Sequence, residues 1–243
     1  MTIQTSLTII VNLHREGLLC FPTLRCINDA ALLARNSGIS LDIFYILDNP
    51  DIETIRVVQQ FNASAVIPGT LFTIDEKDLG AARNYGTTVS RSDFLAFCDG
   101  DDLFSLNWFH SALTLVRSSS YPIVVHPEYV VNFGELRSYA RQVDITQQHS
   151  LDGLLIDNWW CSWTMAPKSV YASIPYPRND LNGSGFGLED WWWNCEVLAN
   201  NIKHKTVTNT VGYYRRKNYG LLAQTLQTVP LLRPNALFSI PPL

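Results

Sequence analysis

Short apolar runs alternate with stretches of helical periodicity along the N-terminal part of the chain. The runs are rich in β-branched and aromatic side chains, which is typical of buried strands. The predicted strands are residues 7–13, 41–47, 65–67 and 94–98. The predicted helices between them are residues 22–36, 52–61 and 79–89. This alternation predicts an α/β fold with a mostly parallel central sheet and helices on both faces.

The pattern changes in the C-terminal part of the chain. Strand patterns are found in residues 122–126, 129–133 and 206–214. Residues 189–200 have a helical pattern, and residues 175–187 have the prolines, glycines and asparagines of a long loop. No internal repeat and no clear linker divide the chain.

Polar side chains follow three of the predicted strands. The first strand ends in Asn12-Leu13-His14, the second is followed by Asp48-Asn49, and the fourth by Asp99-Gly100-Asp101-Asp102. Parallel strands end at one edge of a sheet, and ligands bind beyond their carboxyl ends. A site is therefore predicted at this edge.

Composition and charge narrow the function classes. Hydrophobic residues make up 47% of the 243 residues and charged residues 16%, which is enough apolar material for a sizeable core. The net charge of −4 gives no basic excess for binding nucleic acid. No apolar run reaches the roughly 18 residues of a membrane span, and no signal peptide is predicted. The five cysteines form no CxxC pair, so reduced thiols in a cytoplasmic protein are expected.

The strongest chemical signal is FCDGDD, from Phe97 to Asp102, at the end of an apolar strand. Its three carboxylates repel one another, and a hard divalent cation would relieve that repulsion by accepting oxygen ligands. Mg²⁺ or Mn²⁺ typically takes one or two protein carboxylates and completes its shell with phosphate and water. The alternative is a solvated acidic turn, or a helix cap formed by Asp102.

A second signal is GLEDWWW, from Gly187 to Trp193, which follows a glycine-rich loop and opens a helix. A carboxylate in the first turn of a helix is stabilised as the anion, which suits a general base. The alternative is ordinary helix capping with tryptophans in a core. Successive helical side chains are about 100° apart, so three consecutive tryptophans cannot all face one core. At least one is expected to face a loop, a partner or a ligand, and indole faces are good platforms for sugar rings.

Two basic features complete the candidates. Arg83 lies in the small-residue helix GAARNYG, either as a surface charge or as a phosphate contact. The segment YYRRK, from Tyr213 to Lys217, could close over a diphosphate or form a solvated basic turn. The five histidines lack metal-ligand spacing, and no catalytic role is predicted for any of them.

Taken in order, these motifs resemble the inverting, sugar-nucleotide-dependent glycosyltransferases of the GT-A fold, family 2. The resemblance covers about residues 5–216, and WTMAPK (163–168) resembles the strand and helix start before the acceptor loop of the family. Five further segments carry it, namely TIIVN (8–12), ILDN (46–49), GAARNYG (80–86), FCDGDD (97–102) and GLEDW (187–191).

The resemblance implies a role for each motif residue. Asp190 would be the catalytic base, with Glu189 beside it, and Asp101 and Asp99 would hold a divalent metal, Mn²⁺ or Mg²⁺. The residues implied to bind the nucleotide sugar are Asn12, Asp48, Arg83, Asp99, Arg215 and Arg216. Those implied to bind the acceptor are Trp163, Trp191 and Trp192.

The implied reaction moves one sugar from a nucleoside-diphosphate sugar, with a UDP-sugar favoured, to a hydroxyl of a saccharide or lipid-linked saccharide. The absence of a QxxRW motif favours single transfer over polymerisation. The sequence departs from the family after the second strand, where Leu47 replaces the first acid of an acidic pair and Asn49-Pro50 replaces Gly-Ser. The identity of the nucleotide therefore stays open.

We expect one GT-A domain over residues 1–243. About 1–120 would form the nucleotide-sugar half, about 121–220 the acceptor half, and about 221–243 a C-terminal arm or the edge of a longer polypeptide with further domains. The resemblance also implies a cytoplasmic protein of bacterial surface-polysaccharide synthesis, peripherally associated with the inner face of the membrane.

Three alternatives stay open at this stage. A sugar nucleotidyltransferase shares the sheet and the acidic metal site, but it needs a glycine-rich basic signature near the first strand, where only HREG (14–17) is present. A non-catalytic carbohydrate-binding domain would explain the seven tryptophans but not the acidic motifs. Retaining transfer on the same fold is the third.

Overall fold

The computed structural model describes residues 6–145, 151–218 and 229–238. Its main strands are β1 (Ser6–Leu13), β2 (Ser40–Asp48), β3 (Thr70–Ile74), β4 (Phe94–Asp99), β5 (Leu103–Phe104), β6 (Ile123–Gly134), β7 (Ser138–Arg141), β8 (Met165–Pro167) and β10 (Lys203–Arg216). Its helices are α1 (Cys20–Asn36), α2 (Ile52–Ser64), α3 (Leu79–Val89), α4 (Trp108–Ser118), α5 (Lys168–Ser173) and α6 (Glu189–Ala199). Two 3₁₀ turns, η1 (Gly17–Leu19) and η2 (Leu151–Leu155), complete the helical elements of the described residues.

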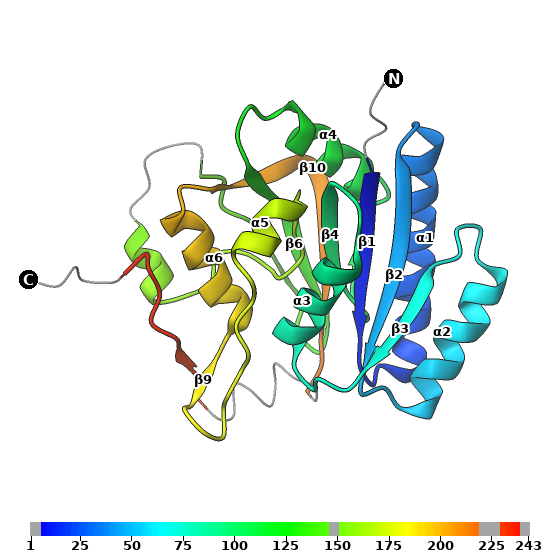
Figure 1. The fold of residues 1–243 in the computed structure, drawn as a ribbon, viewed down its shortest axis with the longest axis horizontal. Helices are drawn as coiled ribbons and strands as arrows, with labels where there is room; N and C mark the ends of the chain where they lie inside the picture. The colour runs from blue at the N-terminus through cyan, green and yellow to red at the C-terminus, as the bar shows by residue number, and fades with distance from the viewer. Residues whose placement is uncertain (1–5, 146–150, 219–228, 239–243) are drawn as a thin grey trace, which may run out of the picture.

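Within the described residues, nine strands form one mixed sheet between two layers of helices (Figure 1). Its strand order is β3-β2-β1-β4-β8-β6-β10-β5, with β7 paired to β6. The neighbours β3, β2, β1 and β4 are all parallel. The predicted α/β fold with helices on both faces is therefore confirmed.

Strand direction decides where a site can lie. The short strand β8 is antiparallel to both β4 and β6, so β6 points the same way as β4. Since β10 is parallel to β6, the carboxyl ends of β1, β2, β4, β6 and β10 lie at one edge of the sheet. This edge brings together the strand ends at Asn12, Asp48, Asp99 and Arg216.

Two of the sequence-based strand predictions are wrong in detail. Residues 65–67 are a loop, and the third strand is β3 at Thr70–Ile74. The side chain of Asn28 bonds both the amide and the carbonyl of Ile67, so no neighbouring strand is needed there. The two patterns at 122–126 and 129–133 form a single strand, β6, which pairs with β10 on both sides of a register shift between Val207 and Val211.

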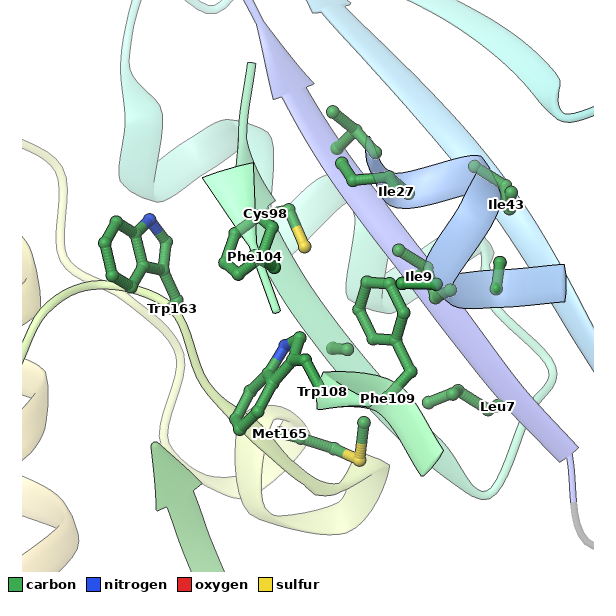
Figure 2. Packing of buried hydrophobic residues seen from close by; sticks show 14 of the residues in the cluster. Leu7, Ile9, Ile27, Ile43, Cys98, Phe104, Trp108, Phe109, Trp163 and Met165 are labelled. Atoms are coloured by element: carbon green, nitrogen blue, oxygen red, sulfur yellow. The ribbon is translucent and has the colours of Figure 1, made fainter. Parts of the chain in front are cut away.

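The core has one apolar layer on each face of the sheet. Figure 2 shows the larger layer, where Ile9 and Ile43 of the sheet face Ile27 of α1. α1, α2 and α4 cover this face, and α3, α5 and α6 cover the other face. Trp193 of α6 lies in the second layer, stacked on Tyr176 with ring centroids 4.9 Å apart.

One helix among the described residues, Gly17–Asn36, has the length and composition of a membrane span. Half of its most apolar window, 50%, is buried inside the protein. Leu24, Ile27 and Ala31 on this helix have no exposed surface and pack against the sheet. The helix thus uses an apolar face within this fold, as core helices do.

Part of the predicted C-terminal arm is seen in the structure. Residues 229–238 cross α6 and the loop before it, and β11 (Leu231–Leu232) pairs there with β9 (Phe186–Gly187). The Trp192 indole donates to the Pro234 carbonyl over 2.9 Å. The rest of the arm, 221–228 and 239–243, lies outside the described residues.

Candidate functional site

The small residues of α3 bring this helix close to the site. A Cβ at Gly86 would lie 2.9 Å from Cγ2 of Ile10 in β1, and a Cβ at Gly80 would overlap the carbonyl oxygen of Pro177. The Asp78 carboxylate caps the helix by accepting from the Ala81 amide over 2.7 Å. This close approach carries Arg83 into the interior, where its side chain is fully buried.

Arg83 joins the two acidic motifs. Its Nη1 donates to Oε1 of Glu189 over 2.9 Å, and its Nη2 donates to Oδ1 of Asp99 over 3.4 Å. The guanidinium also lies over the ring of Tyr176, 5.1 Å from the centroid. Burial alone would lower the pKa of Arg83, but the two carboxylates outweigh it and raise the pKa, so the guanidinium stays charged.

Each aspartate of the acidic motif has different surroundings. Asp99 accepts from the Ser162 hydroxyl over 2.6 Å, and Asp101 pairs with Nζ of Lys217 at 2.5 Å. Asp102 is buried, and burial together with the neighbouring carboxylates raises its pKa well above the ordinary value. It is no helix cap, because α4 begins after Asn107.

Asp101 and Asp99 are the residues that could hold a metal. No group of three or more His, Cys, Asp or Glu side chains within the described residues forms a ready-made cation site. The side chains of Asp101 and Asp99 are 16% and 19% exposed, and both lie at the carboxyl edge of the sheet. Such a pair fits Mg²⁺ or Mn²⁺, which take one or two carboxylates and keep phosphate and water as their other ligands.

The second acidic motif starts α6. Glu189 is held by Arg83 and by Nδ2 of Asn179, which donates to Oε2 over 2.9 Å. Asp190 accepts from the Trp191 amide over 2.8 Å and from Nδ2 of Asn158 over 3.2 Å. Burial, assisted by the charge of Glu189, raises the pKa of Asp190 to about 7. This carboxyl group can therefore both accept and release a proton near neutral pH.

The residue before these two carboxylates is in an unusual backbone conformation. Leu188 has φ 63° and ψ 51°, the left-handed region that non-glycine residues rarely adopt. Such strain costs about 1–3 kcal/mol and persists where surrounding contacts impose it, often at functional sites. Here it sets the direction in which α6 begins, and so the positions of Glu189 and Asp190.

The two predicted nucleotide contacts on β1 and β2 differ in whether their polar atoms are free to bind a ligand. Asn12 is 5% exposed, and neither polar atom of its side chain has a hydrogen-bond partner in the described structure. The Asp48 carboxylate already accepts from the amides of Glu76, Lys77 and Asp78, so it holds the loop after β3. Buried polar groups are almost always paired in proteins, which makes Asn12 a good candidate for a ligand or water contact.

The two arginines at the end of β10 are not equivalent. Nε of Arg215 donates to the Asp101 carbonyl over 2.9 Å, and the guanidinium lies 4.6 Å from the centroid of the Phe133 ring. Nε of Arg216 donates to the Asn132 side chain over 2.7 Å, toward β6. Arg215 is thus part of the acidic cluster, whereas this structure turns Arg216 toward the neighbouring strand.

Comparison with known proteins places the chain in a family. The sequence profile of the glycosyl transferase family 2 matches residues 21–170, more than half of the chain. The chain belongs to this family. No curated protein matches the sequence.

Solved structures agree with the GT-A fold of this family 2 domain. S. aureus TarS matches with a TM-score of 0.63 and 12% identity over 88% of this chain and 37% of that chain. TarS 1–349 in complex with UDP-GlcNAc matches with a TM-score of 0.66 and 11% identity, over 90% of this chain and 61% of that chain. The mannosyltransferase PcManGT from Pyrobaculum calidifontis, in complex with GDP-Man and Mn²⁺, matches with a TM-score of 0.65 and 12% identity. This match covers 92% of this chain and 60% of that chain. The domain thus spans less than two thirds of each of these chains, and the likeness supports the fold alone.

The three tryptophans predicted to bind the acceptor have different surroundings in the structure. The predicted acceptor contact of Trp163 is wrong, because this side chain is fully buried beside Phe104 (Figure 2) and its Nε1 donates to Asp102 over 2.9 Å. Trp191 and Trp192 are half-buried and pack in two separate clusters. The expectation that consecutive tryptophans face different surroundings is confirmed, and the acceptor role of Trp191 and Trp192 stays a prediction.

Trp163 leads to a stability prediction. A Cβ at Gly212 would overlap the Trp163 ring, with Cε3 only 2.5 Å away. The ring cannot retreat without breaking its bond to Asp102, so we expect Gly212→Ala to lower the free energy of unfolding by about 1–3 kcal/mol. Urea unfolding measures this, with Thr208→Val at an exposed position of the same strand as control. An unchanged midpoint would contradict the packing.

The sequence analysis missed four residues of this site, namely Asn158, Ser162, Asn179 and Lys217. Lys217 belongs to the basic segment already singled out. Asn179 lies in the predicted long loop, and Asn158 and Ser162 flank tryptophans in another loop. No spacing rule selects them, because their partners are distant in sequence.

Proposed function

We propose that this domain moves a single sugar from a nucleoside-diphosphate sugar to a saccharide hydroxyl, with inversion at the anomeric carbon. The Arg83 bridge carries the proposal. It ties Asp99, beside the candidate metal site, to Glu189, the neighbour of Asp190. A displacement reaction needs its leaving-group site and its base side by side, because holding both substrates in one geometry supplies much of the rate gain.

Asp190 is the base in this proposal. Its carboxylate takes the proton of the acceptor hydroxyl while that oxygen forms a bond to the anomeric carbon. The bond from the anomeric carbon to the diphosphate oxygen breaks in the same step, and the electron pair leaves with the diphosphate. A pKa of about 7 keeps much of this carboxyl ionised at neutral pH and still makes it a competent proton acceptor.

The donor would bind along the carboxyl edge of the sheet. Asn12 and Nε of Arg83 are both buried and without partners in the described structure, so they are suited to contacts with the nucleotide sugar or its bound water. Asp101 and Asp99 would hold Mn²⁺ or Mg²⁺, which would neutralise charge on the leaving diphosphate. Arg215 would add positive charge there, and Asp48 would shape the base pocket by holding the loop at 76–78.

Substrate class and context extend the proposal further. TarS 1–349 has been crystallised with UDP and with UDP-GlcNAc, and PcManGT with GDP-Man, so a UDP-sugar is our first candidate. The acceptor is proposed to be a saccharide, free or lipid-linked, bound on the side of Trp191 and Trp192. We also propose that the chain forms one domain with a nucleotide-sugar half and an acceptor half. The protein is proposed to be cytoplasmic and to lie at the inner face of the membrane.

Calorimetry tests the donor site. We expect one of UDP, GDP and dTDP, with CMP as control, to bind in the presence of Mn²⁺ and to bind at least about tenfold more weakly to Asp101→Ala, a loss of about 1.4 kcal/mol. Asp42→Ala, an exposed aspartate of β2, should bind like the wild type. Metal-independent sugar binding without any diphosphate binding would favour the carbohydrate-binding alternative instead. Formation of a sugar nucleotide from a nucleoside triphosphate would favour the nucleotidyltransferase.

A further inference from the structure

We infer that Asn158 is a positioning residue that presents the Asp190 carboxylate as a proton acceptor, and that Asn194 fixes Asn158 in the required orientation. The inference rests on the proposed role of Asp190 as base. It gives a role to a residue of the loop between η2 and β8, which also brings Ser162 to Asp99.

The orientation of the Asn158 amide is determined by its neighbours. Its Oδ1 accepts from Nδ2 of Asn194 over 2.9 Å and from the backbone amide of Trp160 over 3.4 Å. A backbone N–H can only donate, so the atom that faces Trp160 must be the oxygen. The nitrogen of Asn158 is therefore the atom that faces Oδ2 of Asp190, at 3.2 Å.

Both oxygens of Asp190 thus face donors. Oδ1 accepts from the Trp191 amide over 2.8 Å, and Oδ2 accepts from Asn158. Hydrogen bonds to the charged form favour that form, so these two donors act against the effect of burial on the pKa of Asp190. They also leave a lone pair on each oxygen for the proton of an acceptor hydroxyl.

The side chains that hold Asn158 in place are buried and uncharged. Asn194 is buried on α6, and its carbonyl lies 3.3 Å from Nε2 of His204. The His204 ring stacks on Trp160 with centroids 4.1 Å apart and pairs with His126 over 2.8 Å. Burial lowers the pKa of His204 to about 3 and that of His126 well below its ordinary value, so both rings are neutral at working pH.

The charges that face Asp190 come from three elements. Glu189 on α6 and Asp99 on β4 raise its pKa, and Arg83 on α3 lowers it. Tyr176 and Cys161 lie nearby, and burial raises the pKa of each, so both are neutral in the range of interest. None of these groups replaces the donor that Asn158 supplies to Oδ2.

The pH dependence of kcat/KM tests this inference. Asn158→Ala removes a donor to the carboxylate, so the acid limb should move to higher pH by about one unit, with transfer about tenfold lower at pH 6 and recovering toward pH 9. Asn158→Asp keeps the shape of the side chain but places a carboxylate oxygen against Oδ2 of Asp190. The two oxygens repel each other, so the acid limb should move to still higher pH. Asn200→Ala, an exposed asparagine at the end of α6, should leave the profile unchanged.

The outcomes separate the inference from the function on which it rests. Asn158 variants that lose the same factor at every pH, or that keep the wild-type acid limb, would overturn the positioning role while Asp190→Asn stays inactive. Retained transfer in Asp190→Asn would overturn the proposed function and this inference with it. Thermal unfolding of each variant, measured alongside, shows that the profiles belong to folded protein.

Discussion

Replacing Asp190 by asparagine is expected to lower glycosyl transfer by about a thousandfold. An amide of similar shape cannot take the proton of an attacking hydroxyl, so the step loses its base. Asp190 lies beside Glu189, but Glu189 is bound by Arg83 and Asn179 and has no route to replace it. Turnover of the sugar nucleotide with the purified acceptor measures the loss.

The same substitution costs one hydrogen bond, because the new Nδ2 faces either the Trp191 amide or Nδ2 of Asn158, but it should remove the fall in stability that Asp190 causes as pH rises. In the unfolded chain an aspartate has a pKa of about 3.9, whereas burial raises the pKa of Asp190 to about 7 in the folded state. Between these values the folded state holds a proton that the unfolded state has lost, so the free energy of unfolding falls as pH rises. The side-chain amide of the Asp190→Asn variant never ionises, and the variant therefore avoids this penalty.

The Tm of the variant relative to the wild type should therefore rise by about 2–4 °C from pH 4 to pH 8 for each kcal/mol of this penalty. Asp29→Asn, at an exposed position of α1, is the control and should change neither transfer nor Tm. Near wild-type transfer in folded Asp190→Asn would show that another group is the base. An inactive variant whose Tm relative to the wild type is the same at pH 4 and at pH 8 would show that Asp190 is ionised in the folded protein at no cost.

Local periodicity was sufficient to predict most of the fold. α3 was expected at residues 79–89 and is found at Leu79–Val89, and β1 and β4 lie within a residue or two of their predicted bounds. Each of these elements has an apolar pattern that only one secondary structure explains. The third strand was misplaced because two short apolar segments follow one another, and the contact that excludes 65–67 comes from Asn28 on another helix.

The structure distinguishes residues of the candidate site that residue type alone does not. Residue type alone does not separate Asp101 from Asp102, and only the resemblance to the family selects Asp101 for the metal. They differ because Trp163, from a loop far along the chain, donates to Asp102 and covers it, whereas Asp101 stays partly exposed. The same distance explains why Trp163 was mistaken for an acceptor contact. Apolar side chains in loops have no periodicity that shows which way they face.

Arg83 was the residue on which the sequence was least decisive, and the structure makes it the centre of the site. Its partner Glu189 is 106 residues away along the chain, so no local pattern could join them. The bridge also explains why α3 is built from small residues. A bulkier helix could not bring a guanidinium to the point between the strand end at Asp99 and the start of α6.

Arg83→Met is therefore expected to lower the free energy of unfolding by about 3–5 kcal/mol at neutral pH and to abolish transfer. Methionine fills much of the space, so the loss comes mainly from leaving Asp99 and Glu189 as unpaired charges in a buried place. The loss should shrink as pH falls, because burial raises the pKa of Asp99 and favours its protonation. Urea unfolding at several pH values measures both effects, with the exposed Arg35→Met on α1 as control.

A double-mutant cycle isolates the bridge from the cavity. If the charge of Glu189 is the cause, Glu189→Gln should destabilise the wild type but restore part of the stability of Arg83→Met, with a coupling of about 0.5–3 kcal/mol. Additive effects would show that Arg83 acts through packing against Tyr176 rather than through its two carboxylates. Restored stability without restored transfer would separate the two duties of Arg83, because a neutral pair can hold α3 against α6 but cannot supply positive charge to a diphosphate.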